Sequence, residues 1–278
     1  MARIKTLLVY AERSDAGAEL LSQAAAFAGD RDAHLVALVL GLQPTPTYAS
    51  LPDVPLDAYF VEFRAAREAV DEATRWTAER LAGRGISHEV RGVVVPMSEA
   101  GRMFARHARY ADLAVFPRGN TADNWHQVVD GALFDSGKPL LLVPPGKRWE
   151  GIGGRVVVAW DAGAEAARAV SCAIDLLGPQ SKVHVVTVDP RVSLEGHGEE
   201  PGADLASMLA RHGLDITVDA IPRENQSVAE ALLRHAQAVE ADMLVAGAYG
   251  HSRLSEIFLG GATRDLMEYT DRPLLMAH

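Results

Sequence analysis

A strand-then-helix alternation runs through the 278 residues once and starts again near residue 155, and this feature most constrains the fold. Residues 4–10 form a short apolar block typical of a buried strand, and the Ala-rich stretch 16–28 after it has the spacing of an amphipathic helix. Residues 156–160 and 164–177 repeat this pair. A pattern that occurs twice predicts two copies of one supersecondary unit.

The remaining segments pair in the same order along the two halves. The strongest match is Ala-Asp-Leu-Ala-Val at 111–115 with Ala-Asp-Met-Leu-Val at 241–245, where we expect the fourth strand of each half to begin. The other predicted pairs are strands 34–42 and 182–189, helices 61–81 and 203–212, strands 87–94 and 215–221, helices 98–109 and 227–239, and closing strands 139–143 and 273–277.

Strands separated by helices imply parallel pairing with right-handed crossovers. The predicted fold class is therefore α/β, with two doubly wound, five-stranded parallel-sheet domains of strand order 3-2-1-4-5. Residues 144–154 are rich in Pro and Gly and have no periodic pattern, which is typical of a linker. We expect the domains to span residues 1–147 and 148–278.

Composition and charge exclude several classes of function. A net charge of −10 with no local run of Lys or Arg argues against nucleic acid and anionic membranes as partners. No apolar run approaches the roughly 20 residues of a membrane helix, and the N-terminal apolar block is too short for a signal peptide. Cys172 is the only cysteine, so no disulfide can form within the chain. These features predict a cytoplasmic protein.

Sequence motifs for hydrolysis or metal binding are absent. The ten histidines show no HExxH and no clustered Cys/His spacing, so no metal site is expected. Neither Gly-x-Ser-x-Gly nor a GxxxxGK loop occurs, and no catalytic residue is predicted.

A glycine-rich loop carries the functional signal. Gly247, Gly250 and Gly260 give the spacing G-x2-G-x9-G, and a helix is expected to begin near Gly261. Glycines let the backbone approach a ligand closely, and a helix start presents unpaired N–H groups and a positive dipole end that suit phosphate. Ligands of open α/β sheets bind where the winding reverses, so Asp161 and Gly247 should border one crevice. An acidic side chain there suits ribose hydroxyls or an adenine amino group.

The block 241–247, the glycine spacing and the closing Arg-Pro-Leu-Leu-Met at 272–276 resemble the universal stress protein family, and the resemblance covers the chain twice. It implies a fold like that of the adenine-nucleotide α-hydrolases, in which the first-strand Asp, the end of strand two and the glycine loop hold ATP. It assigns Asp161 and Val188 to the nucleoside. It assigns ribose and phosphates to Gly247, Gly250, Gly260, Gly261, Ala262 and Thr263.

Two neighbours of these residues have two interpretations each. His251 follows Gly250 and either contacts phosphate or is an exposed loop histidine. Trp160 precedes Asp161 and either stacks on adenine or packs in the core.

Two departures from the family pattern bear on function. Gly261 stands where the family has Ser or Thr, so one hydroxyl donor to phosphate is missing, a loss of about 1 kcal/mol. In the first half, Pro117 occupies the position of Gly247, and proline cannot form the same cradle because it lacks an N–H and fixes φ. Glu12 corresponds to Asp161. We therefore expect the first half to be a degenerate copy.

Three hypotheses about function follow. The first is a cytoplasmic, regulatory universal stress protein that binds ATP, ADP or AMP, with or without Mg²⁺, in its second domain. The second is slow ATP hydrolysis or adenylate transfer at the same crevice, and the third is a ligand-free interaction module. The family resemblance also suggests an intramolecular pseudo-dimer through the last strands and a homodimer of chains.

Overall fold

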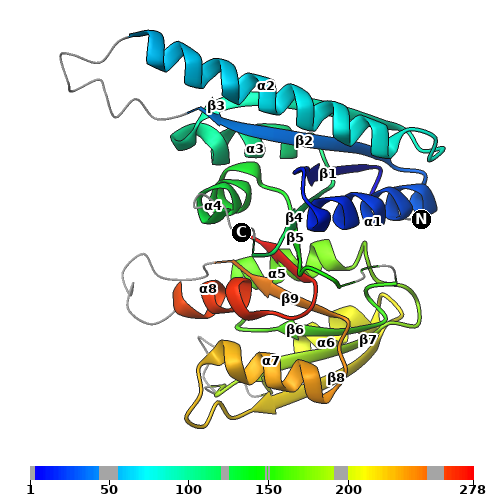
Figure 1. The fold of residues 1–278 in the computed structure, drawn as a ribbon. Coiled ribbons are helices and arrows are strands. Elements are labelled where there is room, and N and C mark those ends of the chain that lie inside the picture. The colour runs from blue at the N-terminus through cyan, green and yellow to red at the C-terminus, as the bar shows by residue number, and fades with distance from the viewer. Residues whose placement is uncertain are drawn as a thin grey trace. The chain divides into compact units, whose positions relative to one another are not determined.

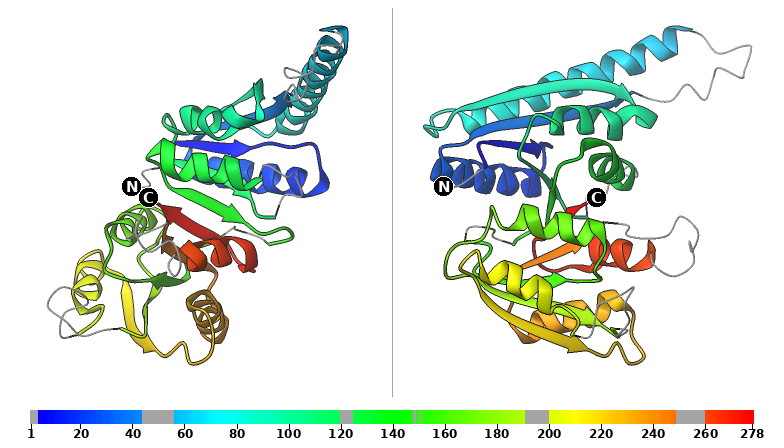
Figure 2. Two further views of the ribbon diagram at one scale, coloured as in Figure 1. Left: turned by 90° about the vertical axis from the view of Figure 1, so that its left-hand side faces the viewer. Right: turned by 180° about the vertical axis from the view of Figure 1, so that it is seen from behind.

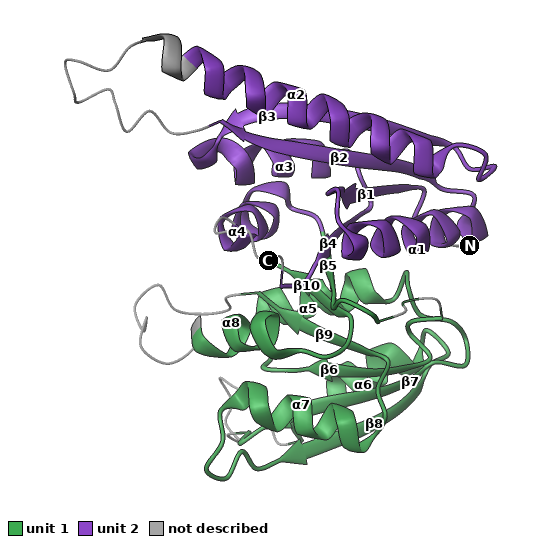
Figure 3. Ribbon diagram, viewed as in Figure 1, with its two compact units in different colours: residues 1–2, 139–278 green, residues 3–138 purple. Residues whose placement is uncertain are grey.

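The computed structural model divides into two compact units, residues 3–138 and residues 139–278, called here the N-terminal and C-terminal units (Figure 3). The last strand of the first repeat, β5 (Leu140–Val143), belongs to the C-terminal unit. The predicted domain boundary at 147/148 separates the two sequence repeats, not these two compact units, and it stays a prediction. The structure describes residues 4–43, 56–119, 125–147, 149, 151–190, 200–248 and 260–278.

The N-terminal unit holds a parallel sheet with strand order β3-β2-β1-β4 (Figure 1). Helix α1 contacts α2, and α3 contacts α4. The elements are β1 (Thr6–Tyr10), α1 (Asp15–Arg31), β2 (His34–Gln43), α2 (Leu56–Leu81), β3 (His88–Pro96), a 3-10 turn (Met97–Glu99), α3 (Ala100–Ala108), β4 (Leu113–Pro117) and α4 (Trp125–Ser136).

The C-terminal unit holds the order β5-β10-β9-β6-β7-β8, in which β5 runs antiparallel to β10 and the other pairs are parallel. The last strands of the two repeats therefore pair with each other, with Leu141 opposite Leu275. The other elements are β6 (Arg155–Ala159), α5 (Ala164–Ala173), β7 (Lys182–Val188), α6 (Ala203–Ala210), β8 (Asp215–Ile221), α7 (Val228–Ala238), β9 (Met243–Gly247), α8 (Gly260–Tyr269) and β10 (Leu274–Ala277).

The predicted fold class and strand order are confirmed. The second repeat shows 3-2-1-4-5 in full as β8-β7-β6-β9-β10, and the first repeat shows its first four strands as β3-β2-β1-β4. In the C-terminal unit, α5 and α6 cover one face of the sheet while α7 and α8 lie side by side on the other (Figures 1 and 2). Because both faces are covered, residues 156–158 of β6 and 243–246 of β9 are all apolar and buried.

The repeated Ala-Asp pair before the fourth strands has a structural reason. Asp112 Oδ2 accepts hydrogen bonds from the backbone N–H groups of Lys5 and Thr6, at 2.8 and 2.9 Å. Asp242 accepts from the N–H groups of Gly153 and Arg155, at 2.9 and 2.8 Å. Each carboxylate thus fastens the start of the first strand of its own repeat, which explains why this motif matches best between the halves.

Helix α5 is shorter than the sequence pattern predicts. It ends at Ala173, four residues before the predicted end at Leu177, because the N–H of Leu176 donates to the carbonyl of Ala173 in a tighter turn, at 2.8 Å. Among the helices that the structure describes, none combines the length and the apolar character needed to cross a membrane.

Candidate functional site

The carboxyl ends of β6, β7 and β9 form the place where a ligand is expected. β6 lies between β7 and β9 in the sheet. From β6 the chain winds outward through β7 to β8 and then returns to the other side of β6 with β9, so the winding direction reverses between β6 and β9. Open α/β sheets bind ligands at such a reversal.

A cavity of about 180 Å³ lies at this reversal. Its walls come from the three strand ends and from α7 and α8, and most of the lining side chains are apolar. Pockets that bury a drug-sized ligand hold about 300–1,000 Å³, so this cavity suits one ring system with the rest of a ligand outside it. The lining residues are Ala159, Trp160, Asp161, Val186, Val188, Val228, Leu232, Ala246, Gly247, Ala262, Thr263 and Leu266.

The structure brings most of the predicted site residues together. Those that line the cavity are Asp161, Val188, Gly247, Ala262 and Thr263. Gly260 and Gly261 are the first two residues of α8, immediately before the two that line it. Gly250 and His251 lie outside the described residues.

Asp161 lies in a tight turn between β6 and α5. Its Oδ1 accepts a hydrogen bond from the N–H of Gly163 at 2.8 Å, and Ala162 between them has a φ of 62°. A non-glycine residue in this left-handed region carries strain of about 1–3 kcal/mol, and such residues often stand at functional sites. The turn holds an exposed carboxylate at the rim of the cavity.

Gly247 has a packing role as well as a place at the cavity. A Cβ at this position would lie 2.5 Å from the backbone N of Ala166 and 2.8 Å from the carbonyl carbon of Glu165. The end of β9 therefore approaches the first turn of α5 more closely than any side chain allows. This contact, independent of any ligand, already requires glycine.

The start of α8 offers the groups that a phosphate needs. The first four N–H groups of a helix have no partner within the helix, and the dipole places partial positive charge there. Gly261 is exposed, and a Cβ added to it would meet nothing within 4 Å. Thr263, by contrast, is buried against the cavity. A side chain at position 261 thus has free space beside these N–H groups.

The sequence interpretation left one cavity residue open and missed several others. Trp160, for which the sequence allows two interpretations, is half-buried and lines the cavity. Val228 and Leu232 reach the cavity from α7, one helical turn apart, after a capping box in which Ser227 and Glu230 bond reciprocally. Their i, i+4 spacing predicts only an apolar helix face, and nothing in the sequence distinguishes cavity from core.

In the N-terminal unit, aromatic rings occupy the positions that correspond to two cavity-lining alanines. In the first repeat Leu7 pairs with Leu113, and at the same place in the second repeat Val156 pairs with Met243. Counting three residues along each strand from these pairs shows that Tyr10 corresponds to Ala159 and Phe116 to Ala246. The rings of Tyr10 and Phe116 stack with centroids 4.3 Å apart. Burial and the nearby Glu12 carboxylate raise the pKa of Tyr10 to about 12, which keeps its phenol neutral. By the same correspondence, Pro117 of the first repeat occupies the position that Gly247 occupies in the second, as the sequence comparison predicted.

Solved structures share this fold. A universal stress protein from Archaeoglobus fulgidus is 15% identical, covers 98% of this chain and 95% of its own, and superposes with a TM-score of 0.71. A functionally unknown protein from Pseudomonas aeruginosa is 17% identical, with coverage of 99% and 93% and a TM-score of 0.59. At these identities the matches establish the fold alone.

A universal stress protein from Archaeoglobus fulgidus has been solved in complex with dAMP. It is 15% identical, covers 51% of this chain and 98% of its own, and has a TM-score of 0.33, so it says nothing about the ligand of this chain. A search of curated proteins gave no match.

The fold and the crevice define a doubly wound α/β protein built from two repeats. Residues 154–278 match the model of the universal stress protein family. The second repeat therefore belongs to the universal stress protein family, which confirms the resemblance seen in its sequence. The first repeat lies outside this match and shares the strand order.

Proposed function

We propose that this protein is a regulatory universal stress protein that binds an adenine nucleotide (ATP, ADP or AMP) in the cavity of its C-terminal unit. The observation that carries the proposal is one cavity bordered by the Asp161 carboxylate on one side and the first turn of α8 on the other. The regulatory role rests on membership of the family.

The apolar part of the cavity suits the adenine base. Val188 and Leu232 supply aliphatic walls, and Trp160 supplies a ring beside them. A flat, weakly polar ring system gains free energy when it leaves water for such a surface, and an aromatic side chain adds about 0.5–1.5 kcal/mol through stacking. A small volume with few polar groups favours a base over a sugar or a phosphate.

Ribose and phosphates find complementary groups at the rim. The Asp161 carboxylate can accept hydrogen bonds from ribose hydroxyls, and the N–H groups that open α8 can donate to phosphate oxygens. A chain of net charge −10 repels anions at long range, so its phosphate contacts must be short and directional. Backbone N–H groups at a helix start meet that requirement without a basic cluster.

The proposal places the protein in the cytoplasm and assigns it binding rather than turnover. The single cysteine, Cys172, supports the location because a chain with one thiol needs no oxidising compartment to fold. Steady release of ADP or AMP from ATP by the purified protein would instead assign catalysis to the crevice. The homodimer stays a prediction.

Mass spectrometry of small molecules released from protein purified without added nucleotide tests the proposal. The wild type is expected to release an adenine nucleotide. Ala159→Tyr is expected to release none, because it places the ring of Tyr10 at the corresponding position of the second repeat and fills the cavity. Ala167→Tyr, on the exposed side of α5 and away from the cavity, is the matched control and should behave as wild type.

Equal recovery from the wild type and Ala159→Tyr would refute the proposed site. A wild-type protein that releases nothing and gives no heat with millimolar ATP, ADP or AMP would refute nucleotide binding and leave a ligand-free interaction module.

A further inference from the structure

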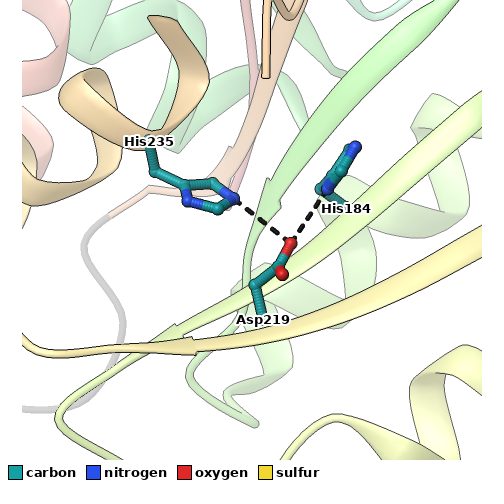
Figure 4. A group of neighbouring side chains, drawn as sticks. All are labelled: His184, Asp219 and His235. Carbon is teal, nitrogen blue, oxygen red and sulfur yellow. Dashed lines mark hydrogen bonds and ion pairs between the residues drawn. The ribbon is translucent and has the colours of Figure 1, made fainter. Parts of the chain in front are cut away.

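Three side chains from three elements of the C-terminal unit converge on one point. His184 comes from β7, Asp219 from β8 and His235 from α7, and Figure 4 shows both imidazoles directed at the carboxylate. Asp219 Oδ2 lies 2.9 Å from His184 Nδ1 and 3.2 Å from His235 Nε2. The ligand atoms of all three lie within 4.8 Å of one another. We infer that these side chains form a binding site for a divalent transition-metal ion, with Zn²⁺ as the best-fitting ion.

The distances suit a tetrahedral ion. With Zn–N of about 2.0–2.1 Å and Zn–O of about 2.0–2.2 Å, neighbouring ligand atoms around tetrahedral Zn²⁺ are about 3.3 Å apart. The two oxygen-to-nitrogen separations here are within a few tenths of an ångström of that value. Ligand atoms much further apart than this would need the backbone to move before they could share one ion.

The donor types select the class of metal. Two imidazole nitrogens and one carboxylate oxygen suit Zn²⁺ and similar late first-row ions, whereas Mg²⁺ and Ca²⁺ prefer ligand sets made entirely of oxygen. With both histidines neutral, the cluster carries the single negative charge of Asp219, which attracts a cation. Three protein ligands leave the fourth tetrahedral position for water or another group.

The three side chains of the cluster are partly buried, which suits a site that exchanges its ion with solvent. The side chains of His184, Asp219 and His235 are 17%, 25% and 16% exposed. The two imidazole rings have centroids 6.0 Å apart and planes at 69°, so they approach the carboxylate from different directions instead of stacking on each other. Solvent therefore reaches the cluster, while the surrounding protein fixes the ligand directions.

The cluster is separate from the nucleotide cavity but adjoins its wall. None of its three residues lines the cavity. His184 is two residues before Val186 on β7 and so faces the same side of the sheet, and His235 is three residues after Leu232 on α7. Val186 and Leu232 both line the cavity. A bound ion would fasten α7 to β7 and β8 behind that wall, whether or not a nucleotide binds.

The alternative is a hydrogen-bonded cluster in which the Asp219 carboxylate accepts from two neutral imidazoles. Titration of untagged, chelator-treated protein with zinc chloride decides between them. We expect one saturable site per chain and a rise of a few degrees in the thermal midpoint on zinc addition. His184→Gln, Asp219→Asn and His235→Gln should each weaken binding by more than about tenfold, since even a group that only supports a ligand contributes about 10–100-fold.

His212→Gln removes an exposed histidine of the same unit and should leave the titration unchanged. No saturable binding by the wild type, or equal binding by wild type and all three variants, would leave only the hydrogen-bonded cluster. If a variant does not fold, cobalt(II) spectra of the wild type decide. An intense visible band that one equivalent of zinc removes supports the site, and a weak octahedral spectrum or no spectrum overturns it.

Discussion

Tyr10 stacks on Phe116, with ring centroids 4.3 Å apart, at the positions of the first repeat that correspond to Ala159 and Ala246 of the second. Phe104 packs its edge against Phe116 with centroids 5.2 Å apart. In the second repeat the two alanines line a cavity instead. The same strand register thus supports an aromatic cluster in one repeat and a cavity in the other, which is why the proposed ligand site lies in the C-terminal unit.

Gly261→Ser is expected to tighten adenine nucleotide binding several-fold. A Cβ at position 261 meets nothing within 4 Å, so the serine fits without strain and adds the hydroxyl that the family pattern places there. One net hydrogen bond contributes about 1 kcal/mol, or about fivefold in Kd. Calorimetric titration with ATP measures the change. Gly261→Ala is the matched control, and an equal gain from alanine would assign the effect to the stiffer helix instead of the hydroxyl.

Gly247→Ala is expected to destabilise the C-terminal unit by about 1–3 kcal/mol, the usual cost of forcing an extra methyl group into a packed site. The new Cβ would lie 2.5 Å from the backbone N of Ala166, and backbone cannot rotate away as a side chain can. Thermal unfolding should show a midpoint several degrees lower. Gly261→Ala makes the same chemical change in open space and should not lower the midpoint; a similar loss in both variants would contradict the packing role.

Acid is expected to destabilise the N-terminal unit through His107. Burial, followed by the charges of Arg91 and Arg106, lowers the pKa of His107 from 6.5. Arg91 Nη1 donates to His107 Nδ1 at 3.0 Å, since arginine has no acceptor, and this bond needs the neutral ring. As the pH falls, His107 therefore takes up its proton at a higher pH in the unfolded chain than in the folded protein. The contribution of neutral His107 to the stability of the fold is complete above pH 6.5, and it is lost as the pH falls through the pKa of His107 in the folded protein.

Thermal midpoints measured between about pH 7.5 and about pH 5 should fall less in His107→Gln than in the wild type, because glutamine still accepts from Arg91 and does not titrate in this range. Protonation of Glu89 does not interfere with this measurement. Its pKa is lowered from 4.5, mainly by the hydrogen bond from Arg91, so its contribution is lost only below that pH. Parallel curves for the two proteins would exclude His107 as the source.

The duplication, the strand order and the position of the crevice could all be predicted from the sequence. Apolar runs and turn residues are local signals, and the rules of parallel α/β winding convert their order into a topology. This reasoning alone predicts that Asp161 and Gly247 border one crevice, and in the structure both line one cavity.

Contacts between side chains on distant segments could not be predicted. His184, Asp219 and His235 come from three elements, and their spacing of 35 and 16 residues matches no motif. Whether Val228 and Leu232 line a cavity or pack in the core depends on whether the facing strand carries an alanine or a phenylalanine. Only the register between the strands shows which residue faces them. Gly247 shows the reverse difficulty: the glycine spacing predicts that it contacts a ligand, and its packing against α5 is an independent reason for glycine at this position.

Calorimetric titration of Ala246→Phe with ATP and AMP, beside the wild type, tests the central claim most directly. The variant places the ring of Phe116 at the corresponding position of the second repeat, so it should fill the cavity and weaken binding by about a hundredfold or more, about 2.7 kcal/mol or more. Far-ultraviolet circular dichroism and the thermal midpoint show whether the fold is intact. Wild-type affinity in a folded Ala246→Phe protein would contradict the assignment of the nucleotide to this cavity.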